Sequence, residues 1–461
     1  MKLKFLGGAG GVTGSKTILS IANENFLIDY GLFQGGSKIR ELNWENHDLS
    51  NISAMILTHA HIDHSGLIPR LTANNFKGSI YCTKDTYKLC EILLEDSAHI
   101  HEEDAKYANI KNYSRHKPAL PLYTVEDAKK ILKSFIVVDF GQETPLSEHL
   151  SIKFHWAGHI LGAAFVECIV NDNGKNNSIV FSGDVGHNRS FVLNGPEKLC
   201  NCDLLIMEST YGNKLHARTP AIDVLELYLN IILKRNGTAI IPSFSVGRTQ
   251  EVLYLINRLM RDGKIPQVPV ILDSPLSKKA NKIFNQTDKN AFLKSELLEC
   301  CESDLFPSTL REIETVQESK DLRNIPGPMI IISASGMIDG GRVVHHIKNR
   351  ITDEKNGIIL VGFQPVGTKG RLLLEGIETI RLHKEEMPVK ATIFYINALS
   401  AHGDYLDLVE WLKSADKLPK MIILNHGEPA SSNHLRLLLN AQFGITTTIA
   451  DLGEEFNLVN L

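Results

Sequence analysis

The chain has 461 residues and a formal net charge of −4, with 43% hydrophobic and 22% charged residues. This balance is typical of a folded globular protein and excludes a disordered chain or a polycation, so any nucleic-acid contact must come from a local basic surface. No stretch approaches the roughly 18 consecutive apolar residues of a membrane span, and the length predicts two domains or one domain with a large insertion. The odd number of scattered cysteines, seven, argues against a disulfide framework and favours a reducing, cytoplasmic setting.

The first half of the chain is rich in short apolar runs interrupted by Gly, Asn and Asp, a pattern that predicts strands. The first four strands are expected at Lys2–Leu6, Lys16–Ile21, Phe26–Asp29 and Ala54–Thr58. A charged pattern from Thr86 to Arg115 then predicts a helix. Strands return at Phe135–Val138, Ser151–Trp156, Ala164–Val170, Ser178–Ser182 and Leu204–Glu208.

After residue 208 the pattern changes to alternating strands and helices, which predicts a parallel sheet flanked by helices. Strands are expected at Thr238–Pro242, Val268–Leu272, Met329–Ser333 and Gly357–Val361, with helices at Arg248–Arg261 and Gly370–Leu374. Short strands resume at Val389–Ile396 and Met421–Leu424, with helices at Tyr405–Lys413 and Asn433–Ala441. We therefore expect an α/β protein whose first domain is discontinuous and carries an α/β insertion.

The run from Thr58 to Gly66 is the most informative stretch, because three histidines and an aspartate lie within six consecutive positions. These residues are His59, His61, Asp63 and His64, and they follow the apolar run 54–57. A strand would deliver them to a loop, where their side chains can converge on one point. Imidazole nitrogen and carboxylate oxygen are zinc ligands. The run therefore predicts a metal site, and most simply a binuclear one.

Two metal ions need more ligands than this run supplies. Three further candidates follow predicted strands beside small residues: His159, Asp184 and His402. Glycine at position 183 would allow close backbone approach beside Asp184. Each residue alone is a common turn residue, but together they complete a ligand set.

These residues resemble the metallo-β-lactamase hydrolase superfamily, whose core is a four-layer αββα sandwich with its metals at one edge. The resemblance implies two Zn2+ ions, the first held by His59, His61 and His159. The second would be held by Asp63, His64 and His402, with Asp184 as the bridging ligand. Asp29 matches the early aspartate of the superfamily, which does not bind the metal itself but orients the residues that do. The implied chemistry is hydrolysis by a metal-bridged hydroxide.

The insertion narrows the class of hydrolase. Five strings resemble the β-CASP nucleases: Glu208–Gly212, Ile241–Gln250, Asp273–Leu276, Ser333–Met337 and Gly340–Arg342. The resemblance covers nearly the whole chain. The relatives it implies are prokaryotic ribonucleases that are similar to the endonuclease subunit of the eukaryotic cleavage and polyadenylation factor. The implied boundaries are 1–210 for the first part of the metallo-β-lactamase domain, 211–378 for the β-CASP insertion, and 379–461 for the C-terminal part.

Serines and cations that follow predicted strands of the insertion can donate to phosphate oxygens. The expected RNA contacts are Ser243, Ser245, Arg248, Ser333, Ser335, Arg342, Lys369 and Arg371. The expected path for RNA is the cleft between the two domains.

The expected catalytic residues are Asp63, Asp184, Glu208 and His402. Glu208 matches an acidic residue of the family that could position a histidine or help proton transfer to the leaving oxygen. The eukaryotic relatives carry a histidine within the stretch that corresponds to Gly367–Leu374, whereas this chain has none there. The general acid therefore stays open among three substitutes, His345, His346 and His426.

The sequence thus predicts a zinc-dependent ribonuclease, with endonuclease action favoured and 5′-exonuclease action left open. RNA is the expected partner and no membrane association is expected, whereas a homodimer is left open. One alternative is a small-molecule hydrolase of the thioesterase or lactonase type, although a small substrate would not need a second phosphate-binding domain. The other is a non-catalytic RNA-binding subunit, against which the intact set of predicted ligands argues.

Overall fold

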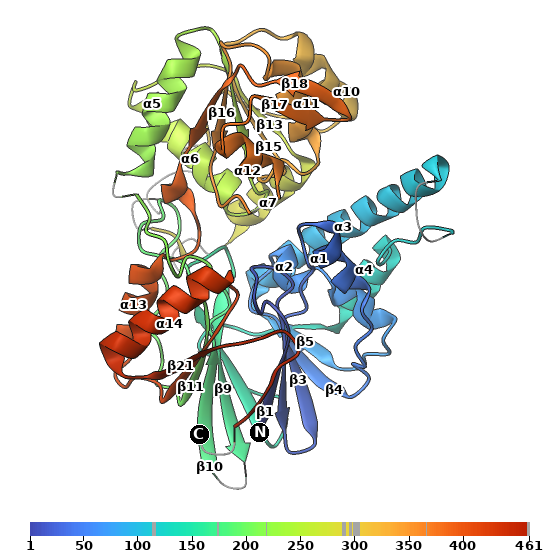
Figure 1. Ribbon diagram of the computed structural model, residues 1–461, viewed down its shortest axis with the longest axis vertical. Helices are drawn as coiled ribbons and strands as arrows, with labels where there is room; N and C mark the ends of the chain where they lie inside the picture. Colours follow the sequence, from blue (N-terminus) through green and yellow to red (C-terminus); the bar gives the residue numbers. More distant parts are fainter. Residues whose placement is uncertain are drawn as a thin grey trace. The chain divides into compact units, whose positions relative to one another are not determined.

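A computed structural model describes residues 1–112, 117–172, 175–217, 219–287, 292–294, 297, 305–365 and 367–458. The chain forms two compact units (Figure 1). The first unit comprises Met1–Asn188, Gly195–Leu215 and His402–Leu461, and the second comprises Arg189–Asn194 and His216–Ala401. Among the described helices, none combines the length and apolar character that a membrane crossing requires.

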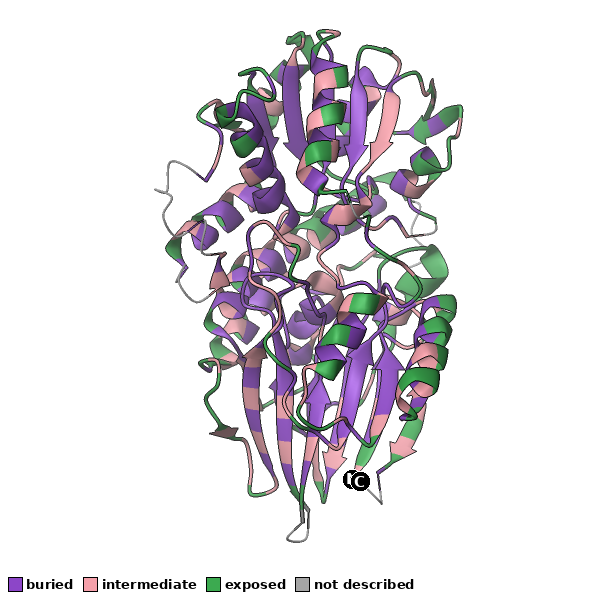
Figure 2. Ribbon diagram, turned by 90° about the vertical axis from the view of Figure 1, so that its left-hand side faces the viewer, coloured by how far each residue is buried: buried purple, intermediate pink, exposed green. Residues whose placement is uncertain are grey.

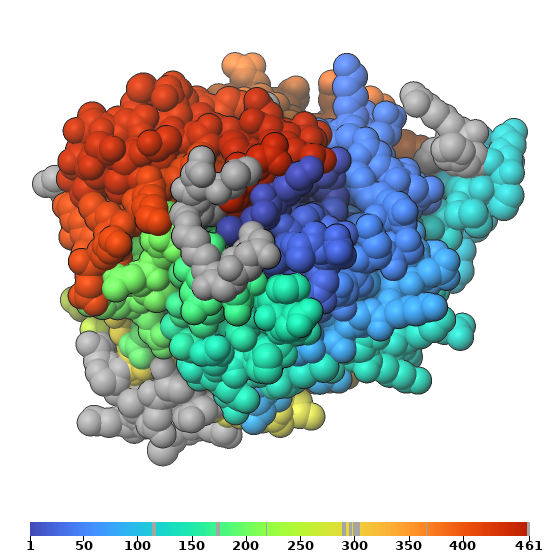
Figure 3. Space-filling model, turned by 90° about the horizontal axis from the view of Figure 1, so that it is seen from below, coloured from blue at the N-terminus to red at the C-terminus, as the bar shows by residue number. Residues whose placement is uncertain are grey.

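The first unit contains two mixed sheets, and the first has the strand order β22-β1-β2-β3-β4-β5-β6. Its strands are β1 (Lys2–Gly7), β2 (Lys16–Ile21), β3 (Glu24–Ile28), β4 (Ile52–Ile56), β5 (Ser79–Cys82), β6 (Phe135–Val137) and β22 (Glu455–Asn457). Strands β3 to β6 run parallel, so β3 and β4 end at the same edge. Strand β22 pairs with β1, and the N-terminal and C-terminal parts of this unit adjoin on the face shown in Figure 3.

The second sheet of this unit has the order β21-β20-β11-β10-β9-β8-β7. Its strands are β7 (Thr144–Pro145), β8 (Leu150–Trp156), β9 (Ala164–Asp172), β10 (Lys175–Phe181), β11 (Leu204–Glu208), β20 (Met421–Asn425) and β21 (Thr446–Ile449). Strands β10, β11, β20 and β21 are parallel neighbours. Two segments more than two hundred residues apart in the chain, β11 and β20, therefore end side by side.

The core of the first unit lies between its two sheets. Phe5 and Phe26 of the first sheet belong to the same buried cluster as Phe154 and Ile206 of the second. Figure 2 shows long buried stretches along the strands of this unit. The helices of this unit are α1 (Ser37–Glu41), α2 (Ile62–Ser65), α3 (Lys84–Lys111), α4 (Val125–Ile131), α13 (Tyr405–Lys413) and α14 (Pro429–Phe443). Because α3 packs on the first sheet and α14 on the second, the expected αββα sandwich is confirmed.

The second unit is built on a six-stranded, all-parallel sheet with the order β14-β13-β15-β12-β16-β19. Its strands are β12 (Thr238–Pro242), β13 (Val270–Asp273), β14 (Leu310–Glu312), β15 (Met329–Ser333), β16 (Gly357–Leu360) and β19 (Thr392–Tyr395). Its helices are α5 (Ala221–Leu233), α6 (Arg248–Arg261), α7 (Pro275–Gln286), α10 (Val316–Asp321), α11 (Arg342–Arg350) and α12 (Lys369–Leu374). A hairpin of β17 (Thr379–Leu382) and β18 (Glu385–Pro388) is paired separately.

Helices cover both faces of the parallel sheet. Ala239 and Ile241 of β12 pack in the cluster that contains α5 and α6, whereas the intervening Ile240 packs in the cluster that contains α11. This alternation explains why the strand is apolar throughout, since a parallel sheet buries both of its faces. The predicted parallel sheet flanked by helices is therefore confirmed.

Most predicted elements occur within a few residues of their expected bounds. The helix expected at Arg248–Arg261 is α6, and the helical region expected from Thr86 is α3, although residues 113–115 of that expectation lie outside the described residues. Short 3₁₀ turns occur at Leu42–Trp44, Ile68–Thr72, Leu132–Ser134, Leu322–Asn324 and Asn397–Leu399. The second unit continues to Ala401, beyond the expected boundary at residue 378, because β19 pairs with β16.

Candidate metal centre

The histidine-rich run leaves the edge of the first sheet directly after β4. Asp29, which follows the neighbouring strand β3, accepts hydrogen bonds from the backbone N of Thr58 at 2.8 Å and from its Oγ1 at 2.9 Å. The adjacent loop is closely packed, since a Cβ atom on Gly31 would lie 1.6 Å from the backbone oxygen of Asp63. The parallel ends of β3 and β4 thus hold the run in one conformation.

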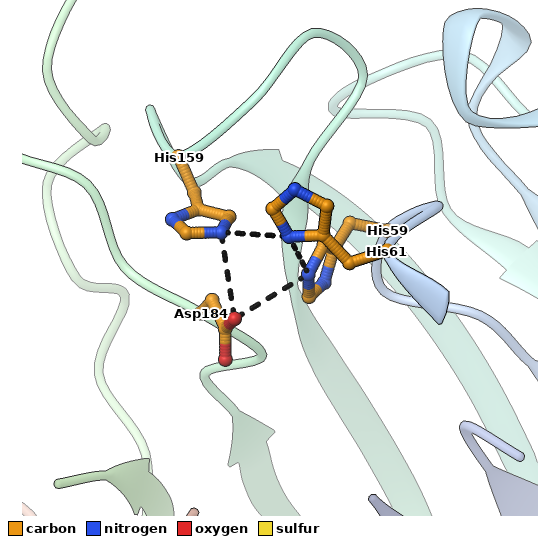
Figure 4. Close-up of side chains that lie close together, drawn as sticks. All are labelled: His59, His61, His159 and Asp184. Carbon is orange, nitrogen blue, oxygen red and sulfur yellow. Dashed lines mark hydrogen bonds and ion pairs between the residues drawn. The ribbon is translucent and has the colours of Figure 1, made fainter. Parts of the chain in front are cut away.

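The first group of potential ligands consists of His59, His61, His159 and Asp184 (Figure 4). The Nδ1 atom of His61 lies 3.2 Å from Nε2 of His59 and 3.1 Å from Nε2 of His159. Both Nε2 atoms lie 3.4 Å from Oδ2 of Asp184. A tetrahedral zinc ion with Zn–N bonds of about 2.0–2.1 Å would separate its ligand atoms by about 3.3 Å, so these spacings fit one ion.

The second group consists of Asp63, His64 and His426. Nε2 of His64 lies 3.2 Å from Nε2 of His426, which is 3.6 Å from Oδ2 of Asp63. The other oxygen of Asp184, Oδ1, lies 3.3 Å from both His64 Nε2 and His426 Nδ1. Asp184 therefore faces the first group with one oxygen and the second group with the other.

The structure places His402 in a third group of potential ligands, with Asp184 and Glu208, whereas the sequence-based assignment put it with Asp63 and His64. Its Nδ1 atom lies 3.1 Å from Oε2 and 3.2 Å from Oε1 of Glu208, and 3.9 Å from Oδ2 of Asp184. The histidine beside Asp63 and His64 is His426, which the sequence offered only as a general acid. The reason is strand pairing: Glu208 at the end of β11 stands opposite Asn425 at the end of β20, so the next residue, His426, reaches the centre.

Outer hydrogen bonds orient the imidazoles. His64 Nδ1 lies 2.7 Å from Oδ2 of Asp29, and His426 Nδ1 lies 3.2 Å from Thr210 Oγ1. His59 Nδ1 lies 3.1 Å from Thr58 Oγ1. In His59 and His64 the second nitrogen, Nε2, therefore points toward the other potential ligands, whereas in His426 both ring nitrogens lie near potential ligands. This arrangement of partners behind the ligands is what metal-binding histidines require, and Asp29 lies where the resemblance implied.

The electrostatics of the first group favour neutral imidazoles. Burial lowers the pKa of His61 to about 3, and burial also lowers the pKa values of His59 and His159. Burial of Asp184 opposes its ionisation, but His426 and His64 hold the pKa of that carboxyl well below its usual range. Neutral imidazoles and an ionised carboxylate are the forms that bind metal. The donor set and its spacing thus fit zinc.

His402 has the opposite character. Burial alone would lower its pKa, but the carboxylates of Glu208 and Asp184 raise the pKa of His402 to about 9. Glu208 is itself buried and accepts a hydrogen bond from the backbone N of Val185 at 2.6 Å. The neighbouring carboxylates therefore favour the protonated form of His402, as Asp184 and Asp29 also do for His64.

Glycine residues bring two of the loops together. A Cβ atom on Gly186 would lie 2.0 Å from the backbone oxygen of Gly158. Any larger residue at this position would separate the loop of Asp184 from the loop of His159. The glycines around these ligands are thus part of the metal centre's construction.

The residues expected to contact RNA lie after strands of the second unit. Loops after β12, β15 and β16 meet at the carboxyl edge of the sheet: Ser243 N donates to Ser333 O at 3.1 Å, and Gly370 N donates to Met337 O at 3.1 Å. Ser243, Ser245, Ser333 and Ser335 all lie in these loops or at the strand ends. Within the described part of the chain, Ser335 has a buried hydroxyl with no hydrogen-bond partner.

All three arginines expected to contact RNA form ion pairs with carboxylates of the same unit. Arg248 is buried and forms an ion pair with Glu251, and Arg342 Nη1 lies 2.7 Å from Oδ1 of Asp273. Lys369 Nζ lies 3.5 Å from the backbone oxygen of Asp339 and Arg371 pairs with Glu375 near the surface. The structure therefore brings the serines together but commits Arg248 to internal packing.

The two other histidines considered as general acids lie in the second unit. His346 is buried, with Nε2 2.6 Å from Oδ2 of Asp273, and His345 stacks on His383. Neither belongs to a group of potential metal ligands among the described residues. Their contacts are those of structural side chains.

The fold and the donor set define a metal-dependent hydrolase of the metallo-β-lactamase type. Three family models match: a metallo-β-lactamase superfamily domain at residues 18–207, a Beta-Casp domain at 249–373, and a Zn-dependent metallo-hydrolase RNA specificity domain at 386–450. A crystal structure of a protein of unknown function from Enterococcus faecalis has the same fold, with a TM-score of 0.53 over 99% of both chains at 14% identity.

Curated relatives extend the likeness to the whole chain. Ribonuclease TTHA0252 from Thermus thermophilus is 31% identical over 98% of this chain and 99% of its own length. An RNase J-like protein from Methanocaldococcus jannaschii is 32% identical over 92% of both chains. Transcription termination factor FttA from Cenarchaeum symbiosum is 26% identical over 99% of this chain and 71% of its own length. The chain belongs to the β-CASP ribonuclease family of the metallo-β-lactamase superfamily.

Proposed function

We propose that this protein is a two-zinc ribonuclease that cuts phosphodiester bonds within RNA. The observation that carries the proposal is the position of Asp184, whose two oxygens face two separate groups of histidines. A carboxylate shared in this way suits a pair of divalent ions that clamp the attacking and leaving oxygens of a phosphodiester. The family and its RNA specificity domain supply the substrate class.

One ion would be held by His59, His61 and His159, and the other by Asp63, His64 and His426, with Asp184 contributing one oxygen to each. When bound, the ions supply Lewis-acid polarisation of the phosphate and an acidified water. Asp29 and Thr210 keep their imidazole partners in the ligating orientation. His402 is left out of this set because Glu208 engages its Nδ1 atom.

His402 would instead supply the proton that the leaving oxygen needs. Glu208 accepts from Nδ1, so Nε2 of the imidazolium carries the proton to be transferred. The Glu208 carboxylate raises the pKa of His402 and so favours its protonated form, and transfer by a positioned group contributes about 10²–10⁴-fold to the rate. Glu208 is then a positioning residue, fixed by its bond from Val185.

RNA would contact the carboxyl edge of the parallel sheet through serine hydroxyls and the start of α12. Ser335 is the best placed donor, since its buried hydroxyl lacks a partner within the described residues. Ser243, Ser245 and Ser333 lie in the adjoining loops, and Lys369 and Arg371 add positive charge at the start of α12. Such contacts to phosphates position RNA without reading its sequence.

The proposal is tested with zinc-loaded protein and a circular, internally labelled RNA, because a circle has no end for an exonuclease. Linear RNA labelled at either end and matched DNA are run in parallel. Asp184→Ala is expected to abolish cleavage, whereas the matched control Asp139→Ala, at an exposed position, keeps it. Cleavage that survives Asp184→Ala would contradict the two-zinc assignment. Cleavage of linear RNA alone would contradict internal cutting.

The small-molecule alternative predicts a different result. A thioesterase or lactonase on the same centre would hydrolyse small esters and leave every RNA intact. The Beta-Casp and RNA specificity domains argue against it, because a small ester needs neither. A non-catalytic RNA-binding subunit is disfavoured by the complete donor set around Asp184.

A further inference from the structure

A second group of potential metal ligands lies on the sheet β8–β9, outside the hydrolase centre. It consists of His155 in β8, Glu167 in β9 and Cys200 in the segment before β11, and their ligand atoms lie within 4.8 Å of one another. Nε2 of His155 lies 3.1 Å from Oε2 of Glu167. Within the described part of the chain, this is the only such group that contains a thiol.

The imidazole of His155 is held in a fixed orientation. Its ring stacks on the buried ring of Phe165, with centroids 4.8 Å apart and planes 10° apart. Its other nitrogen, Nδ1, lies 3.5 Å from Oε2 of Glu197. A carboxylate behind one imidazole nitrogen, with the second nitrogen pointing at further ligands, is the arrangement found in carboxylate–histidine–zinc sites. The stacking and the Glu197 contact are independent of the three ligand atoms themselves.

We propose that His155, Glu167 and Cys200 bind a zinc ion that is separate from the hydrolase centre. Three ligands of the nitrogen, oxygen and sulfur types leave a fourth tetrahedral position for water. A thiolate and a carboxylate together neutralise the charge of a divalent ion, and the thiolate selects zinc over magnesium or calcium. This proposal does not rest on the ribonuclease activity.

The ion would join two strands to a loop. His155 and Glu167 lie on adjacent strands β8 and β9, whereas Cys200 belongs to the segment that leads into β11, whose last residue is Glu208. Binding of zinc displaces the thiol proton of Cys200 and the proton of His155 Nε2 when that nitrogen is protonated. The expected role is structural, because an ion that binds only the folded chain raises its stability.

The test uses Co²⁺ in place of Zn²⁺, since a thiolate bound to Co²⁺ gives a charge-transfer band in the near ultraviolet. The hydrolase centre offers only nitrogen and oxygen ligands, so among the groups of potential ligands in the described residues only this one can give the band. The metal-free full-length protein is titrated with Co²⁺, and the wild type is expected to show the band. Cys200→Ala is expected to lose it together with one bound metal ion per chain.

Two further variants test whether the band comes from Cys200 in particular and whether the site is independent of the hydrolase centre. Cys202→Ala removes a thiol two residues away and is expected to keep the band, whereas Asp184→Ala disrupts the hydrolase centre and is also expected to keep it. Circular dichroism confirms that each variant is folded. Absence of the band in the wild type, or its persistence in folded Cys200→Ala, would overturn the proposal. A protein that shows the band but does not cleave RNA would count only against the ribonuclease assignment.

Discussion

Two buried aspartates, Asp184 in the first unit and Asp273 in the second, both follow or end a strand and both contact histidine. Their surroundings differ. Asp273 accepts from His346 Nε2 at 2.6 Å, from Arg342 Nη1 at 2.7 Å and from Ser319 Oγ, so both oxygens of its carboxylate have donors. Around Asp184, imidazole nitrogens of neighbouring histidines face one another at 3.1–3.2 Å.

The difference separates a structural network from a binding centre. Two neutral imidazoles can share one N–H···N hydrogen bond, but Nδ1 of His61 faces the Nε2 atoms of both His59 and His159 and can donate to only one of them. A cation placed among the three nitrogens can be bound by all of them. A network with matched partners needs no further group, because its donors already satisfy the buried carboxylate. Chemically similar residues therefore predict ligand binding in one unit and stability in the other.

The largest expected effect comes from replacing each of the two C-terminal histidines, His426 and His402, in turn. His426→Ala should remove about one zinc ion per chain. The resulting loss of metal affinity should be larger than the roughly 10–100-fold loss that follows removal of an outer hydrogen-bond partner. His402→Ala should keep the full metal content but lower kcat by about 10²–10⁴-fold, as expected for a lost proton donor. Elemental analysis after dialysis and RNA-cleavage rates measure both. Loss of metal in His402→Ala, with metal retained in His426→Ala, would restore the assignment made from sequence.

The next effect concerns pH. Because the Glu208 carboxylate raises the pKa of His402, the proton donor is present below that raised pKa and is lost as the pH rises through it. Glu208→Gln removes the neighbouring charge and should move the alkaline fall of kcat down toward the ordinary histidine range near about 6.5. The pH profile of RNA cleavage measures this shift, with Glu410→Gln on the surface of α13 as the control. An alkaline limb that stays in place would argue against the Glu208–His402 pair.

A smaller effect on activity, but a large one on stability, is expected in the second unit. Asp273→Asn leaves His346 and Arg342 without their charged partner and should destabilise this unit by roughly 3–5 kcal/mol without changing the metal content. All three tryptophans, Trp44, Trp156 and Trp411, lie in the first unit, so hydrogen exchange of β13 and β15 is the appropriate measurement. Asp321→Asn on α10 serves as control.

The same network predicts an acid dependence. Burial of Asp273 opposes its ionisation, but the hydrogen bonds from His346, Ser319 and Arg342 hold the pKa of its carboxyl below the usual range. Its stabilising contribution is therefore fully present above the unfolded value of about 3.9 and is lost as the pH falls through the folded value. Protection of β13 that is equal in the wild type and Asp273→Asn above that range would contradict the structural role.

The smallest effect is expected at the surface of α12. Arg371 pairs with Glu375 four residues later, and losing such an exposed pair costs about 0.3–0.5 kcal/mol. If Arg371 contacts a phosphate, Arg371→Ala should weaken RNA binding and reduce the dependence of log affinity on log salt by about 0.7. Lys320→Ala on α10 is the matched control. An unchanged salt slope would remove Arg371 from the RNA contacts.

The sequence predicted the elements well where the pattern was local. Helix α6 has its expected bounds because its apolar positions recur with helical spacing. The sequence also indicated that Arg248 is paired, since Glu251 lies three residues later on the same helix, and oppositely charged side chains at this spacing are neighbours. That signal could have excluded Arg248 as an RNA contact.

The sequence could not show which strands are neighbours. His402 and His426 each follow a short strand or turn near small residues, and nothing local distinguishes a ligand from a proton donor. The parallel pairing of β11 with β20 decides the matter, because it sets Glu208 opposite Asn425 and brings His426 into the centre. The group of His155, Glu167 and Cys200 was invisible for the same reason, since a strand pair and a loop assemble it.

By itself, the sequence determined that this chain binds metal, because the run His59–His64 places several ligands within one loop whatever the rest of the chain does. It also determined the alternation of strands and helices, since hydrophobic periodicity is a local property. Only the tertiary structure decided which distant histidine completes the set and which stands beside Glu208. Coordination requires ligand atoms to converge within a few ångströms, and the pairing of strands distant in the chain, which no local pattern encodes, sets those distances.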